Sequence, residues 1–306
     1  MTIDPHDLPN LDVTSNDDII SFTTNIIKET EGFIGFIYDD GKGVPTIGYG
    51  VALLVFDGTQ WRLRSQDQLN DIFDGIGHQL DSTDIALLQQ AAAYLNGNKD
   101  PVTGVVTDNL GNVLINPFNL VKVSNPDPSL NVTNWIINDS DADQMIKNMF
   151  TSDPARPVTQ SIDLIEGQDG LRNQLGQYSN GDYIWDIYKD SREGAALLSL
   201  WYNGQKKTIP TRKTDSNGNV IEGFLVDALF RDDRVAAWWE IRYGSNGDKS
   251  SGIAKRRYWE SAIFSLYNDE NNASGEAQNI IDYLLGTPQH PNGMAKSMGS
   301  DSIDLV

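Results

Sequence analysis

The segment from residue 31 to residue 50 constrains the fold more than any other part of the chain. It reads Glu31-Gly-Phe-Ile-Gly-Phe-Ile-Tyr-Asp-Asp40-Gly-Lys-Gly-Val-Pro-Thr46-Ile-Gly-Tyr-Gly50. A glycine directly after Glu31 is a frequent way to end a helix. The aspartates and glycines after Tyr38 are turn residues, because both types tolerate a positive φ. The order therefore predicts a helix that ends at Glu31, followed by a β-hairpin.

Apolar residues at helical spacing precede Glu31 and define this helix. They are Ile19, Ile20, Phe22, Ile26 and Ile27. The run from Ser15 to Asp18 matches a capping box, which predicts the helix start. Residues 36–38 are expected as a short strand and residues 46–51 as the returning strand. We expect Asp40 on an exposed tip between the two strands.

Three side chains in this segment have the chemistry of a hydrolytic site. Glu31 and Asp40 are carboxylates nine positions apart, and Thr46 adds a hydroxyl on the next strand. Two carboxyl groups that face each other across a gap can hydrolyse a glycosidic bond, one as acid and the other as base. Each acid taken singly is an ordinary helix-end or turn residue, so the indication comes from their combination.

At these positions the chain resembles the phage-type lysozymes, the muramidases of tailed bacteriophages and related bacterial toxins. The resemblance is carried by Glu31-Gly, by Tyr38-x-Asp40 and by Thr46-Ile-Gly-x-Gly50. It implies a mostly helical α+β fold with two lobes, a small β-hairpin lobe and a larger helical lobe. It also implies that Glu31 is the general acid, that Asp40 activates a water molecule and that Thr46 positions this water.

The same resemblance suggests substrate-binding residues. Tyr49 and Gly50 would line the site from the hairpin, with Tyr49 as the aromatic ring for sugar stacking. Tyr202 and Asn203 end an apolar helix that is similar to the central helix of the family. Segments 137–146 and 252–260 also resemble family segments and occur in the expected order. The chain departs from the family at two positions, which are Val51 in place of a common histidine and Ile253 in place of a common arginine.

The resemblance divides the chain into three parts. Residues 1–14 are expected as a flexible N-terminus, residues 15–269 as the lysozyme-like domain with an insertion at about 52–136, and residues 270–306 as a C-terminal extension. Two stretches read as hairpin tips, 107–113 and 214–220. Beyond the first helix, helices are predicted near 67–79, 83–95, 140–151, 158–176, 190–203, 224–240, 252–267 and 274–285.

Composition excludes several other classes of protein. The net charge of −20 argues against nucleic-acid binding, which needs clustered Lys and Arg. Cysteine is absent, which excludes disulfides and thiolate metal sites, and the three histidines lack paired spacing, so neither a metal nor a cofactor is expected. The first residues do not form a secretory signal, and no apolar run is long enough to span a bilayer. We expect synthesis in the cytoplasm and action in the periplasm or on the cell wall after delivery or lysis.

The expected activity is hydrolysis of the β-1,4 bond between N-acetylmuramic acid and N-acetylglucosamine, with inversion at the anomeric carbon. The expected partners are peptidoglycan glycan strands, and an immunity protein or a secretion machinery for an antibacterial effector. An endolysin or a bacteriocin fits the same residues. The alternative from another class is a binding module that keeps the fold and has lost catalysis. The sequence leaves open the delivery route, the role of residues 52–136 and 270–306, and the oligomeric state.

Overall fold

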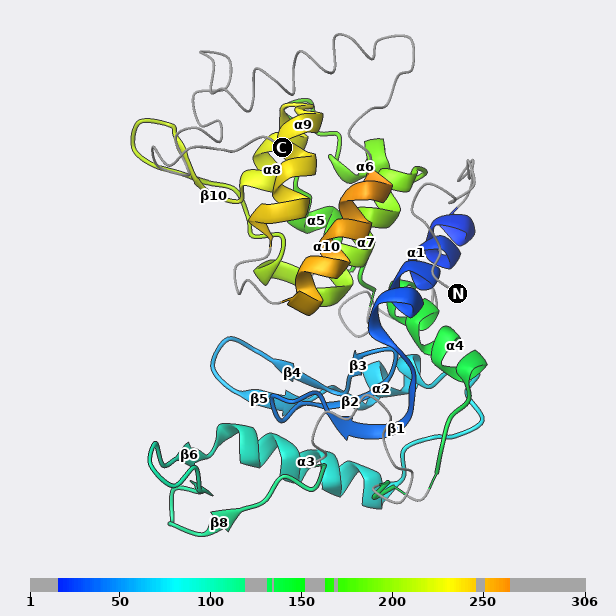
Figure 1. The fold of residues 1–306 in the computed structure, drawn as a ribbon, viewed down its shortest axis with the longest axis vertical. Coiled ribbons are helices and arrows are strands. Elements are labelled where there is room, and N and C mark those ends of the chain that lie inside the picture. The colour runs from blue at the N-terminus through cyan, green and yellow to red at the C-terminus, as the bar shows by residue number, and fades with distance from the viewer. Residues whose placement is uncertain are drawn as a thin grey trace. The chain divides into compact units, whose positions relative to one another are not determined.

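A computed structural model describes residues 16–118, 131–133, 135–151, 163–167, 170–245 and 251–264 (Figure 1). The fold is α+β, with helices and small antiparallel sheets, as predicted. The chain divides into two compact units, one formed by residues 20–170 and the other by residues 1–19 with 171–306. The division falls inside the first helix.

The first helix and the sheet after it follow the predicted order. Helix α1 (Asn16–Glu31) ends where expected, and Gly32 takes a φ of +78° that stops it. Its predicted capping box lies partly outside the described residues. Strands β1 (Ile34–Asp39), β2 (Pro45–Gly48) and β3 (Val51–Ala52) form one antiparallel sheet in that order.

The returning strand was predicted as one piece, and this prediction is wrong. The chain leaves β2 at Gly48, which has a φ of +64°, and turns again at Gly50, which has a φ of +88°. These two glycines allow β3 to fold back antiparallel on β2, with Ile47 opposite Val51. The turn between β2 and β3 therefore carries Tyr49 and Gly50 at its tip.

In its described residues, the insertion after β3 contains two helices and two small sheets. Its elements are β4 (Leu54–Phe56), β5 (Trp61–Leu63), α2 (Gln66–Ile72), α3 (Ser82–Asn96), β6 (Asn98–Lys99), β7 (Val106–Thr107) and β8 (Val113–Leu114). The predicted helix at 67–79 is wrong in its second half, because the chain turns after Ile72 and Gly75 takes a φ of +70°. The predicted hairpin tip at 107–113 is confirmed, since the N–H of Asp108 donates to the carbonyl oxygen of Asn112.

Helix α4 (Asp139–Phe150) completes the unit of residues 20–170 and packs against β2 and α2. A capping box at Asn138 starts it, as the acids that follow suggest. The core between α1, the first sheet and α4 is aliphatic. Ile27, Ile37, Ile47 and Ile146 are fully buried there.

The second unit is built mainly from helices. Its described elements are α5 (Leu171–Leu175), α6 (Trp185–Tyr188), α7 (Arg192–Gly204), η3 (Gln205–Lys207), β9 (Lys213–Thr214), β10 (Val220–Glu222), α8 (Phe224–Phe230), α9 (Arg234–Trp239), the π-helix η4 (Glu240–Gly244) and α10 (Ser251–Phe264). Helices α7 and α10 pack closely on each other. The hairpin tip at 214–220 is confirmed by the antiparallel pair β9 and β10.

Two helix predictions between residues 158 and 240 are wrong. Residues 163–167 form a turn and α5 is short, so no continuous helix covers 158–176. The helix predicted at 224–240 is broken between α8 and α9, where Asp232 takes a φ of +54° and Asp233 caps α9. The helix predicted at 274–285 lies outside the described residues.

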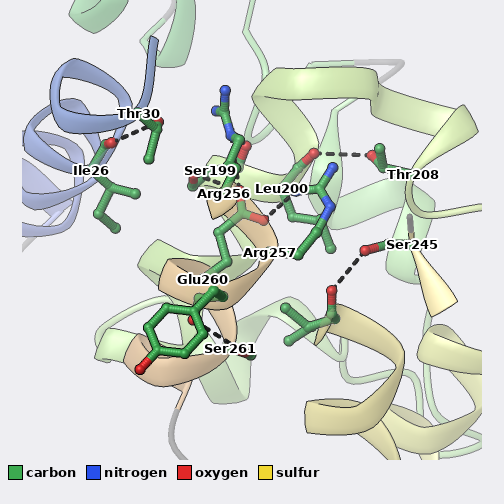
Figure 2. A network of polar contacts seen from close by, with 12 residues as sticks. Ile26, Thr30, Ser199, Leu200, Thr208, Ser245, Arg256, Arg257, Glu260 and Ser261 are labelled. Carbon is green, nitrogen blue, oxygen red and sulfur yellow. Dashed lines mark hydrogen bonds and ion pairs between the residues drawn. The ribbon is translucent and has the colours of Figure 1, made fainter. Parts of the chain in front are cut away.

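A buried charged network joins α7 to α10 (Figure 2). The carboxylate of Glu260 is fully buried and accepts hydrogen bonds from Ser199 Oγ at 2.8 Å and Arg256 Nε at 3.1 Å. Its second oxygen accepts a hydrogen bond from Arg257 Nη1. Because buried charges are stable only when paired, this network fixes the register of the two helices.

Candidate active site

Glu31 is the last residue of α1, and its side chain lies against the backbone of Gly50. A β-carbon at position 50 would stand 3.6 Å from Cδ of Glu31 and 3.8 Å from its Oε2 atom. The side chain of Glu31 is exposed. The side chain of Glu31 therefore lies close to the turn between β2 and β3.

Asp39 is the structural carboxylate of the turn after β1. Its Oδ1 atom accepts hydrogen bonds from the backbone N–H groups of Gly41 and Gly43, each at 2.7 Å. Its Oδ2 atom accepts a hydrogen bond from Asn116 Nδ2 at 2.9 Å, and both side chains are buried. Asn116 comes from the far end of the insertion, and sequence reasoning missed it because nothing near it in the chain indicates this contact.

Asp40 is less exposed than the sequence suggested. It is half-buried, and its Oδ1 atom accepts hydrogen bonds from the N–H groups of Lys42 at 2.8 Å and Val44 at 3.2 Å. Asp40 lies in the turn between β1 and β2 as predicted, but it is half-buried and not exposed, because the turn closes around this oxygen. Its Oδ2 atom accepts no hydrogen bond from the residues that the structure describes. One carboxylate oxygen is anchored, and the other can receive a proton.

Thr46 lies directly across the sheet from Tyr38. Paired residues on neighbouring strands place their side chains on the same face of a sheet. Thr46 is buried, and its hydroxyl donates a hydrogen bond to the carbonyl oxygen of Val44 at 3.0 Å. The hydroxyl oxygen of Thr46 keeps its capacity to accept a hydrogen bond.

The charges of both acids act on the hydroxyl of Tyr38. Burial raises its pKa above the usual range, and the negative charges of Glu31 and Asp40 raise it further. Glu31 and Asp40 thus both act on the hydroxyl of Tyr38, which pairs with Thr46 across the sheet. Sequence reasoning used Tyr38 only as a motif position.

Tyr49 does not have the geometry expected of a sugar-stacking residue. Only 4% of Tyr49 is exposed, and its ring centroid lies 5.6 Å from that of Phe33. Its hydroxyl donates to Asp139, and Lys28 Nζ lies 5.4 Å from the ring centre. Burial, then the bond to Asp139, raises the pKa of Tyr49 to about 12. The stacking role predicted for Tyr49 conflicts with this burial, because no ring face is left open.

A salt bridge next to Tyr49 ties α1 to α4. Lys28 Nζ lies 3.0 Å from Asp139 Oδ2 and 2.8 Å from Asp143 Oδ1. Partial burial lowers the pKa of Lys28, but the two carboxylates outweigh this effect and raise it overall. The hydrogen bond from Tyr49 and then that from Lys28 lower the pKa of Asp139. This cluster holds the end of the helix that carries Glu31.

Tyr202 and Asn203 belong to the other unit. Both lie in the last turn of α7 and are half-buried. The two positions that depart from the family pattern are also placed: Val51 is fully buried in β3, and Ile253 is half-buried in α10. An apolar side chain at 51 thus belongs to the core of the first sheet.

Neither a metal nor a membrane site is indicated in the part of the chain that the structure describes. No three His, Asp or Glu side chains there are grouped so that they could hold a metal ion. None of the helices in the described ranges has the length and apolar character needed to cross a membrane. Comparisons with family models, with curated proteins and with solved structures found no match for this chain.

Proposed function

We propose that the protein is a peptidoglycan hydrolase that cleaves the β-1,4 bond between N-acetylmuramic acid and N-acetylglucosamine. The observation that carries the proposal is that Tyr38 pairs with Thr46 across the sheet, while the charges of Glu31 and Asp40 both raise the pKa of its hydroxyl. Most glycoside hydrolases use a pair of carboxyl groups that flank the scissile bond. The resemblance to phage-type lysozymes supports the same assignment.

In the proposed reaction the two acids have different roles. Glu31, exposed beside Gly50, protonates the leaving oxygen. Asp40 takes a proton from a water molecule through its Oδ2 atom, and Thr46 holds this water by accepting a hydrogen bond. Because Asp40 activates water and does not attack the sugar, the product is inverted, which requires carboxyl groups about 6.5–9.5 Å apart. No cofactor takes part in these steps.

The proposal extends to the fold and the biological setting. The unit of residues 20–170 would be the hairpin lobe, enlarged by its insertion, and the unit with α7 and α10 would be the helical lobe of a lysozyme-like fold. The enzyme would reach the cell wall as an antibacterial effector, a bacteriocin or an endolysin. An effector of this kind would be matched by an immunity protein in the cell that makes it.

The decisive experiment is a turbidity assay on purified peptidoglycan with the Glu31→Gln variant. A general acid contributes about 10²–10⁴-fold to the rate, so the variant should lose nearly all activity at unchanged thermal stability. Glu29→Gln is the matched control, because Glu29 is an exposed acid on the same helix, two residues earlier. Activity of Glu31→Gln within threefold of wild type would refute the assignment.

Product analysis separates this activity from related ones. Mass spectrometry of the fragments should find N-acetylmuramic acid at the new reducing ends. Proton NMR during hydrolysis should show the inverted anomer first. In this scheme Asp40 does not attack the sugar. The carboxylate introduced by Thr46→Glu would supply a nucleophile, so this variant should trap a covalent glycosyl-enzyme. A retained anomer from the wild-type enzyme would overturn the role given to Asp40.

A further inference from the structure

Tyr38 has a hydroxyl group without a hydrogen-bond partner among the residues that the structure describes, although the side chain is largely covered. It stands opposite Thr46 on the first sheet, two positions before Asp40. The hydroxyl oxygen itself is not fully buried, so a water molecule can reach it.

Asp40 and Thr46 can each accept a hydrogen bond from the water molecule of the proposed reaction, and a donor to the water oxygen would fix its position further. An ionised carboxylate is an acceptor only. Thr46 has a single hydroxyl proton, and this proton is donated to the carbonyl oxygen of Val44. Asp40 and Thr46 can therefore accept hydrogen bonds from the water but cannot donate one to it. Tyr38, which pairs with Thr46 across the sheet, has a hydroxyl proton left to donate.

We propose that Tyr38 positions the attacking water by donating a hydrogen bond to its oxygen, an inference that rests on the proposed hydrolase activity. One water proton passes to Asp40 Oδ2 while the water oxygen bonds to the anomeric carbon. The other water hydrogen points to Thr46 Oγ1. The glycosidic bond breaks as the leaving oxygen takes the proton of Glu31, and Tyr38 keeps its own proton throughout.

The electrostatics of the site suit this role. Burial and the nearby acids Glu31 and Asp40 raise the pKa of the Tyr38 hydroxyl above its usual range. The hydroxyl therefore stays neutral, and able to donate, at any pH at which the enzyme works. A lysine at this position would instead pair with Asp40 and compete with the water for its free oxygen.

Tyr38→Phe tests the inference, because it removes the hydroxyl and keeps the ring. Hydrolysis of soluble peptidoglycan fragments should lose about 10–100-fold in kcat with KM within twofold, as expected for an interaction with the reacting water. Tyr178→Phe is the matched control, since it removes a partly buried hydroxyl that donates to the carbonyl oxygen of Leu229 in the other unit. Thermal unfolding of both variants shows that folding is kept. Tyr38→His, which restores a donor, should regain part of the loss.

A double-mutant cycle with Thr46→Val distinguishes positioning of the water from a structural effect. If Tyr38 and Thr46 hold the same water, the loss in the double variant should be clearly smaller than the product of the two single losses. Full kcat in Tyr38→Phe, or strictly multiplicative losses, would overturn the role of Tyr38 while the hydrolase assignment stands. A wild-type enzyme that cleaves no peptidoglycan would refute both.

Discussion

The carboxyl group of Glu31, at the end of α1, and the backbone of Gly50, between β2 and β3, lie against each other. A β-carbon at position 50 would be 3.6 Å from Cδ of Glu31, which is ordinary contact distance. The helix end and the second turn of the sheet thus meet at the proposed acid. Gly50 therefore has two roles. Its backbone lies against the Glu31 side chain, and its φ of +88° permits the turn.

Gly50→Ala should therefore impair activity more than it impairs folding. An L-residue in a left-handed conformation costs about 1–3 kcal/mol, and the new methyl group would contact the side chain of Glu31, so a shift of the strained turn would displace the proposed acid. We expect activity to fall at least tenfold in the turbidity assay. Gly58→Ala is the control, because Gly58 has a φ of +98° and open space around it. Equal losses of activity in both variants would contradict a role for the contact with Glu31.

Removal of Glu260 should destabilise the unit that contains α7 and α10. Its carboxylate is paired with two buried arginines, Arg256 and Arg257. Breaking a buried pair by removal of one partner costs about 3–5 kcal/mol, because a buried charge is left without compensation. Glu260→Gln should lower the free energy of unfolding in urea by this amount. Ser199→Ala, which removes one neutral donor to the same carboxylate, should cost less, about 1.5–3 kcal/mol.

Glu240 on the π-helix should make stability depend on pH near neutrality. Burial raises its pKa from 4.5 to about 7. The folded state then binds more protons than the unfolded state between these values, so stability falls as the pH rises from about 4.5 to 7 and stays low above it. Glu240→Gln should flatten this dependence and gain roughly 3 kcal/mol over the wild type at pH 8. Urea unfolding curves of the wild type and of Glu240→Gln at pH 4.5 and pH 8 measure this difference. An equal pH dependence of stability in the two proteins would contradict the role of Glu240.

Acids of the insertion should not take part in the chemistry. Asp57 accepts hydrogen bonds from Thr59 and Gln60 in a surface turn, and Asp67 lies in the first turn of α2. Their replacement by Asn should change hydrolysis of soluble fragments by less than threefold. The same replacement at Asp71 and Asp74 should behave alike. A loss of hydrolysis of more than about tenfold at any one of the four would mean that the active site is assigned to the wrong residues.

Features that depend on neighbouring residues could be predicted from the sequence. The end of α1 at Glu31 and Gly32, the turn after Tyr38 and the two hairpin tips all follow from the φ that glycine tolerates and from aspartates that bind nearby N–H groups. These preferences act over a few positions and do not need the rest of the fold. The same local information located the proposed acid and base.

Only the tertiary structure decided which side chains are covered and which distant groups they meet. Asn116 completes the turn at Asp39 from 77 positions away, and Asp139 takes the hydroxyl of Tyr49 from 90 positions away. These contacts bury Tyr49, which the sequence presented as an open aromatic ring. Burial depends on which elements pack together, and a local pattern of residues carries no record of this packing. The sequence by itself determined the helix end, the turns and the pair Glu31 and Asp40, whereas packing decided the environment of Tyr38 and Tyr49.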